Sequence, residues 1–189
     1  MSNPGGLEIE RRWLMAGFPE QLPEGLPAGV TFLCEIQKAQ GYVSTAPVVR
    51  IRSEVTAAQG DTPAKEEYIL CIKGKGRLAR TEIETPLTAD VFAQMQDFIG
   101  VPLVRKQTRL YRLADGRVME CSLVDEGEPS AFYYAEVEFS SLDEATLFAA
   151  PEWFGEEKTM DGSFSMSAYW RAKCAAFAKT NEPDPKEDP

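Results

Sequence analysis

The sequence predicts a mainly β, α+β fold in which eight antiparallel strands close into a barrel and helices lie at its flanks. Alternation of apolar and polar residues dominates the chain, as in half-buried strands. Most of the alternating stretches follow one another through short connections, which favours antiparallel pairing of neighbours. Helical spacing of apolar residues appears only between and after these stretches. Closing such a sheet removes its unpaired edges, so a barrel or tunnel is the expected architecture.

The strand boundaries follow from turn residues as well as from alternation. Gly74 and Gly76 indicate a tight hairpin, and Asp115-Gly116 is the clearest hairpin turn of the chain. A loop rich in Gly, Asp and Pro separates two further strands near residue 60. We expect strands at residues 7–14, 31–44, 48–55, 67–74, 79–85, 103–113, 117–124 and 132–139.

Three segments are predicted to be helical. Thr88 is a suitable N-cap for a helix with apolar residues at helical spacing. A second helix opens at Ser141 or Asp143 and ends before Pro151, and a third covers residues 167–179. We expect these helices to cover apolar outer surface of the barrel.

Length and composition indicate one soluble globular domain. The 189 residues are 43% hydrophobic and 26% charged, which is ordinary for this class. Residues 1–6 are expected to form a flexible leader, residues 7–179 a single tunnel domain, and residues 180–189 a disordered acidic tail.

Charge and cysteine usage narrow the functional classes. A net charge of −10 argues against nucleic acid as a partner, and we find no apolar run that would span a membrane. The four cysteines lie far apart and there is no histidine, so zinc-finger and haem spacings are absent. We interpret the cysteines as reduced thiols of a cytoplasmic protein.

The most informative segment is Glu8-Ile9-Glu10-Arg11-Arg12. Side chains alternate between the two faces of a strand, so Glu8, Glu10 and Arg12 line one face while Ile9 faces the other. Two carboxylates at this spacing can hold one hard cation between them. The pattern returns in Glu136-Val137-Glu138. Such a face suits a metal-bound polyphosphate.

Charged residues of like parity recur in the strands between these two acidic pairs. They are Arg50 and Arg52, Lys73, Arg80 with Glu82 and Glu84, Arg105 and Arg109, and Glu120. A solvated outer face of the sheet would explain any one pair. Arginine is unusually frequent at these sites, however, and its planar fork matches phosphate oxygens. The series therefore favours a charged, water-filled lumen.

These motifs together resemble the CYTH superfamily, the triphosphate tunnel metalloenzymes. Residues 8–14 resemble its ExExK signature, and the resemblance continues in order through residues 40–43, 50–52, 72–74, 80–84, 108–109 and 136–139 to residues 151–157. It covers about residues 7–168, and the ordered series is far more specific than ExExK alone.

The resemblance implies a set of residue roles. The implied ligands of Mg²⁺ or Mn²⁺ are Glu8, Glu10, Glu136 and Glu138. The implied phosphate contacts are Arg50, Arg52, Lys73, Arg80 and Arg109. Arg12 and Tyr42 occupy the positions of the implied catalytic pair, whereas Glu82, Glu84 and Glu120 are expected to support neighbouring cations.

The chain also departs from the family pattern. Arg12 stands where lysine is usual, and because arginine keeps its proton it is a poor general base. Ser122 replaces a common aspartate, Gln107 replaces a lysine, and Met166 replaces an asparagine. These departures leave the tunnel intact but bear on catalysis.

Three functions are therefore compatible with the sequence. The first is metal-dependent hydrolysis of a triphosphate, either inorganic tripolyphosphate or a nucleoside triphosphate. The second is a class IV adenylate cyclase, and the third is a non-catalytic polyphosphate or nucleotide binder. The expected partner is a small triphosphate, with neither nucleic acid nor membrane, and a homodimer is compatible because two-fold dimers are common.

Overall fold

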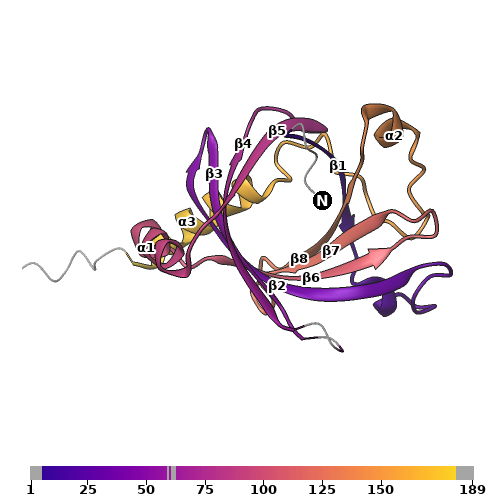
Figure 1. Ribbon diagram of the computed structural model, residues 1–189, viewed down its shortest axis with the longest axis horizontal. Helices are drawn as coiled ribbons and strands as arrows, with labels where there is room; N and C mark the ends of the chain where they lie inside the picture. The colour runs from indigo at the N-terminus through magenta and orange to yellow at the C-terminus, as the bar shows by residue number, and fades with distance from the viewer. Residues whose placement is uncertain (1–5, 59, 61–62, 182–189) are drawn as a thin grey trace, which may run out of the picture.

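The structure, a computed structural model, is a closed barrel of eight antiparallel strands (Figure 1). It describes residues 6–58, 60 and 63–181. Around the barrel the strands follow the order β1-β5-β4-β3-β2-β6-β7-β8. The strands are β1 (Leu7–Met15), β2 (Thr31–Thr45), β3 (Val48–Thr56), β4 (Lys65–Lys73), β5 (Ala79–Pro86), β6 (Val104–Arg112), β7 (Val118–Val124) and β8 (Phe132–Glu138).

All eight predicted strands are confirmed, with boundaries that differ from the expected ones by no more than two residues. Hairpins connect β2 to β3, β6 to β7 and β7 to β8, and β2 pairs along most of its length with both β3 and β6. Gly116 in the expected β6–β7 turn has φ +90°, a conformation that favours glycine. Local alternation and turn chemistry therefore specify the sheet.

The three predicted helices are also present, as α1 (Ala89–Ile99), α2 (Leu142–Leu147) and α3 (Met166–Thr180), together with a short 3₁₀ helix, η1 (Pro19–Gln21). Thr88 and Ser141 cap α1 and α2, and Ser165 caps α3 through the backbone N–H of Ala168. The second helix is shorter than expected because it stops before Phe148, whose ring is buried in the core.

Two hydrophobic clusters hold the barrel and its covering segments together. The larger cluster lies on the outward faces of β1, β6, β7 and β8, where Trp13 packs edge-on against Phe148 and Phe154. The smaller cluster joins Trp170 of α3 to Tyr42 and Tyr134. Tyr134 shares strand parity with Glu136, so α3 meets lumen-facing side chains at one end of the barrel. The expectation that all helices cover outer surface is thus corrected for α3.

A segment after α2 completes the barrel beside β1. β1 pairs with β5 only over residues 7–9. Farther along, the backbone N–H of Leu14 donates to Glu156 O at 2.9 Å, and the backbone N–H of Lys158 donates to Arg12 O at 2.8 Å. This segment, residues 156–159, therefore fixes the backbone from which Arg12 projects.

The expected leader and tail fall almost wholly outside the described residues. Of residues 1–6 the structure describes only Gly6, and of residues 180–189 only the first two. α3 itself continues to Thr180. None of the helices in the described part of the chain is both long and apolar enough to cross a bilayer.

Gly155 offers a test of how residues 156–159 are seated. A Cβ at this position would lie 1.9 Å from the backbone oxygen of Leu14, so Gly155→Ala should force the segment away from β1. We expect a loss of about 1–3 kcal/mol in the free energy of unfolding, typical of overpacking, measured by denaturant titration. Gly162→Ala is the matched control, because there only the flexible end of Arg77 must move. Equal stability of the two variants would contradict this packing.

Candidate functional site

Strand alternation and register bring acidic and basic side chains from all eight strands to the lumen. Across neighbouring strands, Glu8 lies opposite Arg80, Lys73 opposite Glu82, and Arg12 opposite Glu136. The pairing continues with Glu120 opposite Glu136 and with Tyr42 opposite Arg50. The predicted convergence of both charge signs on one enclosed face is therefore present.

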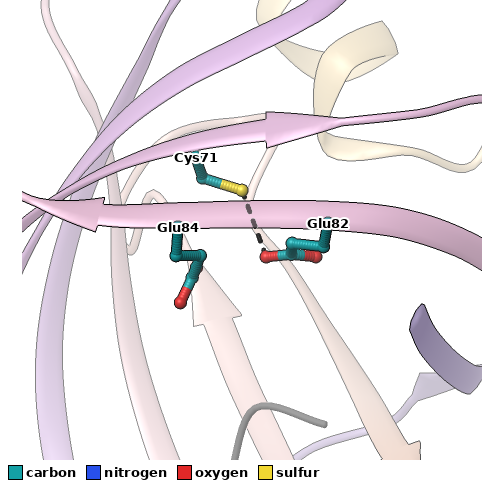
Figure 2. A group of neighbouring side chains, drawn as sticks. All are labelled: Cys71, Glu82 and Glu84. Carbon is teal, nitrogen blue, oxygen red and sulfur yellow. Dashed lines mark hydrogen bonds between the residues drawn. The ribbon is translucent and has the colours of Figure 1, made fainter. Parts of the chain in front are cut away.

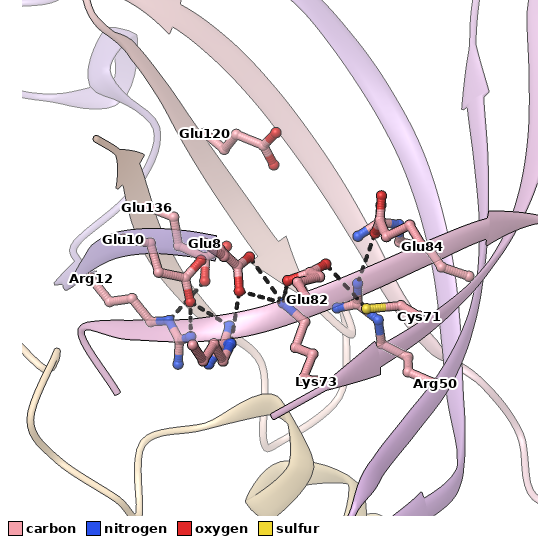
Figure 3. Close-up of polar contacts among 12 residues, drawn as sticks. Glu8, Glu10, Arg12, Arg50, Cys71, Lys73, Glu82, Glu84, Glu120 and Glu136 are labelled. Atoms are coloured by element: carbon pink, nitrogen blue, oxygen red, sulfur yellow. Dashed lines mark hydrogen bonds and ion pairs between the residues drawn. The ribbon is translucent and has the colours of Figure 1, made fainter. Parts of the chain in front are cut away.

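The glutamates of β1 are held by cations from β1, β4 and β5 (Figure 3). Lys73 Nζ lies 3.0 Å from Glu8 Oε1, and Arg80 Nε lies 2.7 Å from Glu8 Oε2. Glu10 is buried and accepts from Arg80 Nη2 at 2.6 Å and from Arg12. Arg12 also lies 2.8 Å from Glu136. These pairs offset the cost of burying charge in the lumen.

Arg50 differs from these paired cations. Its side chain is only 6% exposed, and its Nε and Nη2 atoms have no hydrogen-bond partner among the described residues. The nearest carboxylate oxygen, on Glu84, is 3.8 Å from Nη2. Burial lowers the pKa of Arg50, but Tyr42, Cys71 and the nearby glutamates raise it above its ordinary value, so the guanidinium stays charged. It is a buried cation with open donors facing the lumen.

Arg52 lies two residues farther along β3. Its Nη2 donates to Glu84 at 3.1 Å, and its Nε lies 2.8 Å from Glu54. Glu84 therefore serves Arg52 and lies near Arg50, and Glu82 serves Lys73 at 2.7 Å. This arrangement matches the supporting role expected for the two β5 glutamates.

Two lumen lysines were not predicted. Lys38 of β2 lies 2.8 Å from Glu120 and 3.5 Å from Glu54. Lys106 of β6 is buried and donates to Tyr134 Oη at 2.9 Å. Strand alternation could have identified Lys38, because it lies an even number of residues from Tyr42 on β2 and therefore on the same face. Glu120, expected to support a cation, supports Lys38.

Gln40 is a further lumen residue that the sequence interpretation missed. It is fully buried between Lys38 and Tyr42 on β2, and its Nε2 donates to Tyr42 Oη at 3.1 Å. Its Oε1 has no hydrogen-bond partner among the described residues. Its parity with Tyr42 could have identified it.

Arg109 does not lie in the lumen, so its predicted phosphate contact is wrong. On β6 it alternates with Thr108, which contacts Ser122 Oγ inside the barrel at 2.8 Å. Arg109 instead stacks over Phe18 at 4.0 Å and pairs with Glu20 and Glu35 on the outer face. β6 carries cations on both faces. The side chain of Lys106 points into the lumen, whereas that of Arg109 points outward.

Both members of the catalytic pair implied by the family resemblance hold their protons firmly. Burial lowers the pKa of Arg12, but the carboxylates of Glu10 and Glu136 raise it above its ordinary value, so it remains a cation. Burial raises the pKa of Tyr42, which keeps its phenol protonated. The pKa of Lys106 is shifted in the opposite direction. Burial and the nearby charge of Lys38 lower it to about 7.

The lumen carboxylates differ strongly from one another in pKa. Burial, a hydrogen bond with Glu82 and the charge of Glu10 raise the pKa of Glu8 to about 8. Burial would raise the pKa of Glu82, but the hydrogen bonds with Glu8 and Lys73 lower it. The two side chains therefore differ in acidity although Lys73 contacts both of them.

Glu138 is the carboxylate best placed to take a metal ion. It lies opposite Glu10 in the β1–β8 register and makes no ion pair with any residue that the structure describes. Burial, followed by the charges of Glu120, Glu10 and Glu136, raises its pKa. Glu10 and Glu136 are each paired with arginine, so among these carboxylates Glu138 is the one whose charge is left for a hard divalent cation.

A second group of potential ligands lies between β4 and β5 (Figure 2). Cys71, Glu82 and Glu84 offer ligand atoms within 4.8 Å of one another, and the Cys71 thiol contacts Glu82 Oε1 at 3.1 Å. Burial raises the pKa of this thiol to about 11. A protonated thiol is a poor ligand for Mg²⁺, and Lys73 and Arg50 lie beside this group, so its charge and donor set do not favour the expected ion.

Comparison with known proteins identifies relatives over most of the chain. An inorganic triphosphatase from Nitrosomonas europaea is 31% identical over 164 residues, which cover 85% of this chain and 95% of that protein. No family model matches the chain.

Solved structures give the same result. The structure of an inorganic triphosphatase superposes with a TM-score of 0.54 at 28% identity, covering 86% of this chain and 93% of that one. A second structure of the protein with that same designation, there described as hypothetical, also has a TM-score of 0.54, at 27% identity over 86% of this chain and 96% of that one. Together with the barrel and its ordered lumen motifs, this relationship shows that the chain belongs to the CYTH superfamily, the triphosphate tunnel metalloenzymes.

Proposed function

We propose that this protein is a divalent-metal-dependent triphosphatase that hydrolyses inorganic tripolyphosphate or a nucleoside triphosphate inside its barrel. Arg50 is the observation that carries the proposal, because a buried guanidinium with two open donors needs an anionic partner. The relationship to an inorganic triphosphatase supports the reaction class.

The phosphate chain would bind to cations from several strands. Arg50 and Arg52 of β3, Lys73 of β4 and Arg80 of β5 face one lumen, with Lys38 and Lys106 on the other side of β3. Phosphoryl transfer depends on positioning and charge neutralisation more than on covalent chemistry, so a ring of fixed cations suits it.

Glu138, Glu10 and Glu136 would hold the metal ion, and Glu8 joins the set expected from the sequence. Carboxylate oxygens favour Mg²⁺ or Mn²⁺. When bound, such an ion polarises a phosphoryl oxygen and offsets negative charge. Because Glu8, Glu10 and Glu136 are paired with Lys73, Arg80 and Arg12 in the structure, anion and cation binding would share the same network.

The residues of this chain divide the remaining roles. Arg12, held between Glu10 and Glu136, would orient both carboxylates and bind phosphate as a permanent cation. Tyr42, protonated and held by Gln40, would donate a hydrogen bond to phosphate or water. Lys106 is better suited than Arg12 to exchange a proton near neutral pH.

The cytoplasmic location and the homodimer expected from the sequence remain predictions. The four cysteines are free thiols in the structure, in keeping with a cytoplasmic protein. A homodimer also stays a prediction.

The main experiment measures metal-dependent phosphate release from tripolyphosphate and from ATP, with cyclic AMP monitored in the same reaction. Arg50→Gln should weaken substrate binding by about 2–5 kcal/mol, because it removes a buried charge pair with phosphate. Arg105→Gln, on an exposed side chain of β6, is the control and should leave KM unchanged. Cyclic AMP as the main product, or unchanged substrate affinity in Arg50→Gln, would overturn the proposal.

The metal assignment is tested through Glu138. Chelation should stop hydrolysis, and Mg²⁺ or Mn²⁺ should restore it. Glu138→Gln removes a ligand without breaking an ion pair to a described residue, so the variant should stay folded and bind the ion at least about tenfold more weakly, or about 1.4 kcal/mol. Calorimetric titration of Mn²⁺ measures this affinity. The exposed Glu152→Gln serves as control, and equal affinity in both variants would exclude Glu138.

The acidity of Lys106 is directly measurable. Reductive ¹³C-methylation and NMR titration should show one lysine with a pKa of about 7, and Lys106→Arg should remove that signal. Since the folded pKa lies below the unfolded value of about 10.4, the unfolded chain binds more protons between these pH values. This group should therefore make the fold more stable as pH rises from about 7 to about 10. A titration midpoint near 10 would refute the assignment.

A further inference from the structure

A cavity of about 290 Å³ lies where α3 and the segment before it meet β8. Arg12, Tyr134 and Glu136 line it on the barrel side, and Phe132, Phe164 and Tyr169 line it toward α3. Phe132 is the centre of an aromatic group, with ring centroids 5.6 Å from Phe164 and 5.5 Å from Tyr169. The cavity is therefore mostly apolar but ends at two charged residues.

The charged end of the cavity is continuous with the lumen network. Arg12 and Glu136 line the cavity and also belong to the chain of ion pairs that reaches Glu10 and Arg80. A molecule extending from the lumen past Arg12 would thus pass from a charged into an aromatic environment. Inorganic tripolyphosphate, which is charged along its whole length, would leave the aromatic part unused.

We infer that this cavity holds the base of a nucleoside triphosphate whose phosphates lie among the lumen cations. The inference rests on the proposed function and names its substrate class. Aromatic side chains stack on the π-face of any base, and the phosphates would supply the negative charge that Arg12 and Arg50 attract. The substrate would therefore be bound by both of its chemically different halves.

The size of the cavity limits the occupant. Pockets for small ligands begin at about 300 Å³, so 290 Å³ suits one ring system and not an oligonucleotide. The net charge of −10 likewise opposes binding of a nucleic-acid backbone. A single nucleotide, with its phosphates in the local field of the lumen, meets both limits.

Ala172 provides a test that leaves the fold intact. It lines the cavity from α3 yet is exposed, so Ala172→Trp fills the cavity without burying new volume in the core. Ala176→Trp, one helical turn later and also exposed, is the matched control. We would measure KM for ATP, CTP and tripolyphosphate in both variants, and, if no compound is hydrolysed, the affinity of each compound by calorimetry with Mg²⁺ present.

The inference predicts that the unmodified protein uses ATP or CTP with a lower KM than tripolyphosphate. Ala172→Trp should raise the nucleotide KM about tenfold, the loss of one stacked base, while the tripolyphosphate KM and both constants of Ala176→Trp stay unchanged. Comparison of ATP with CTP shows whether a purine or a pyrimidine is preferred.

The contrary outcomes separate the two proposals. Turnover of tripolyphosphate alone, or equal effects of Ala172→Trp on all three compounds, would overturn the base-binding cavity and leave the triphosphatase standing. If no compound is hydrolysed, the triphosphatase fails. Calorimetry then tests whether the cavity binds the base. Weaker nucleotide binding in Ala172→Trp supports the inference, whereas unaffected or absent nucleotide binding overturns it.

Discussion

The high cost of burying an unpaired charge constrains the whole interior of this barrel. Eight strands turn one face of each toward a common lumen, and most of the inward positions near β1 are charged. A barrel of this kind needs most of its inward charges to have a partner of opposite sign, as in the cross-strand pairs Glu8–Arg80 and Lys73–Glu82. The outer apolar cluster then supplies the hydrophobic stabilisation that the lumen cannot.

The same pairing links anion binding to cation binding. A polyphosphate that draws Arg80 and Lys73 toward itself leaves Glu8 and Glu10 without their partners. A divalent cation at those glutamates would restore the balance, and it would need the phosphate in turn because the lumen cations would otherwise repel it. A lumen of mixed sign therefore favours a metal–phosphate complex over either ion alone. Arg50 lacks such a close pair, so an anion would bind there without breaking an ion pair.

Most of the fold could be predicted because its signals are local. Alternation and turn residues fix the eight strands, and N-capping serines and threonines fix the helix starts. It was harder to predict which side chains point into the lumen where both faces of a strand are polar. On β6, Arg109 and Lys106 have opposite parity, and Arg109 faces outward because Glu20 and Glu35, from distant segments, neutralise it there. No local pattern contains that information, and the same holds for the position of α3 over one end of the lumen.

The substitution of arginine at position 12 is best understood together with Lys106. A guanidinium can bridge two carboxylates at once, and Arg12 does so between Glu10 and Glu136. Arg12 is thereby held in place by two carboxylates, but as a permanent cation it cannot accept a proton. Lys106, buried beside Lys38 and bound to Tyr134, lies in an environment that weakens its hold on a proton. In this chain, therefore, orientation of the acidic residues and exchange of protons are suited to two different residues, Arg12 on β1 and Lys106 on β6.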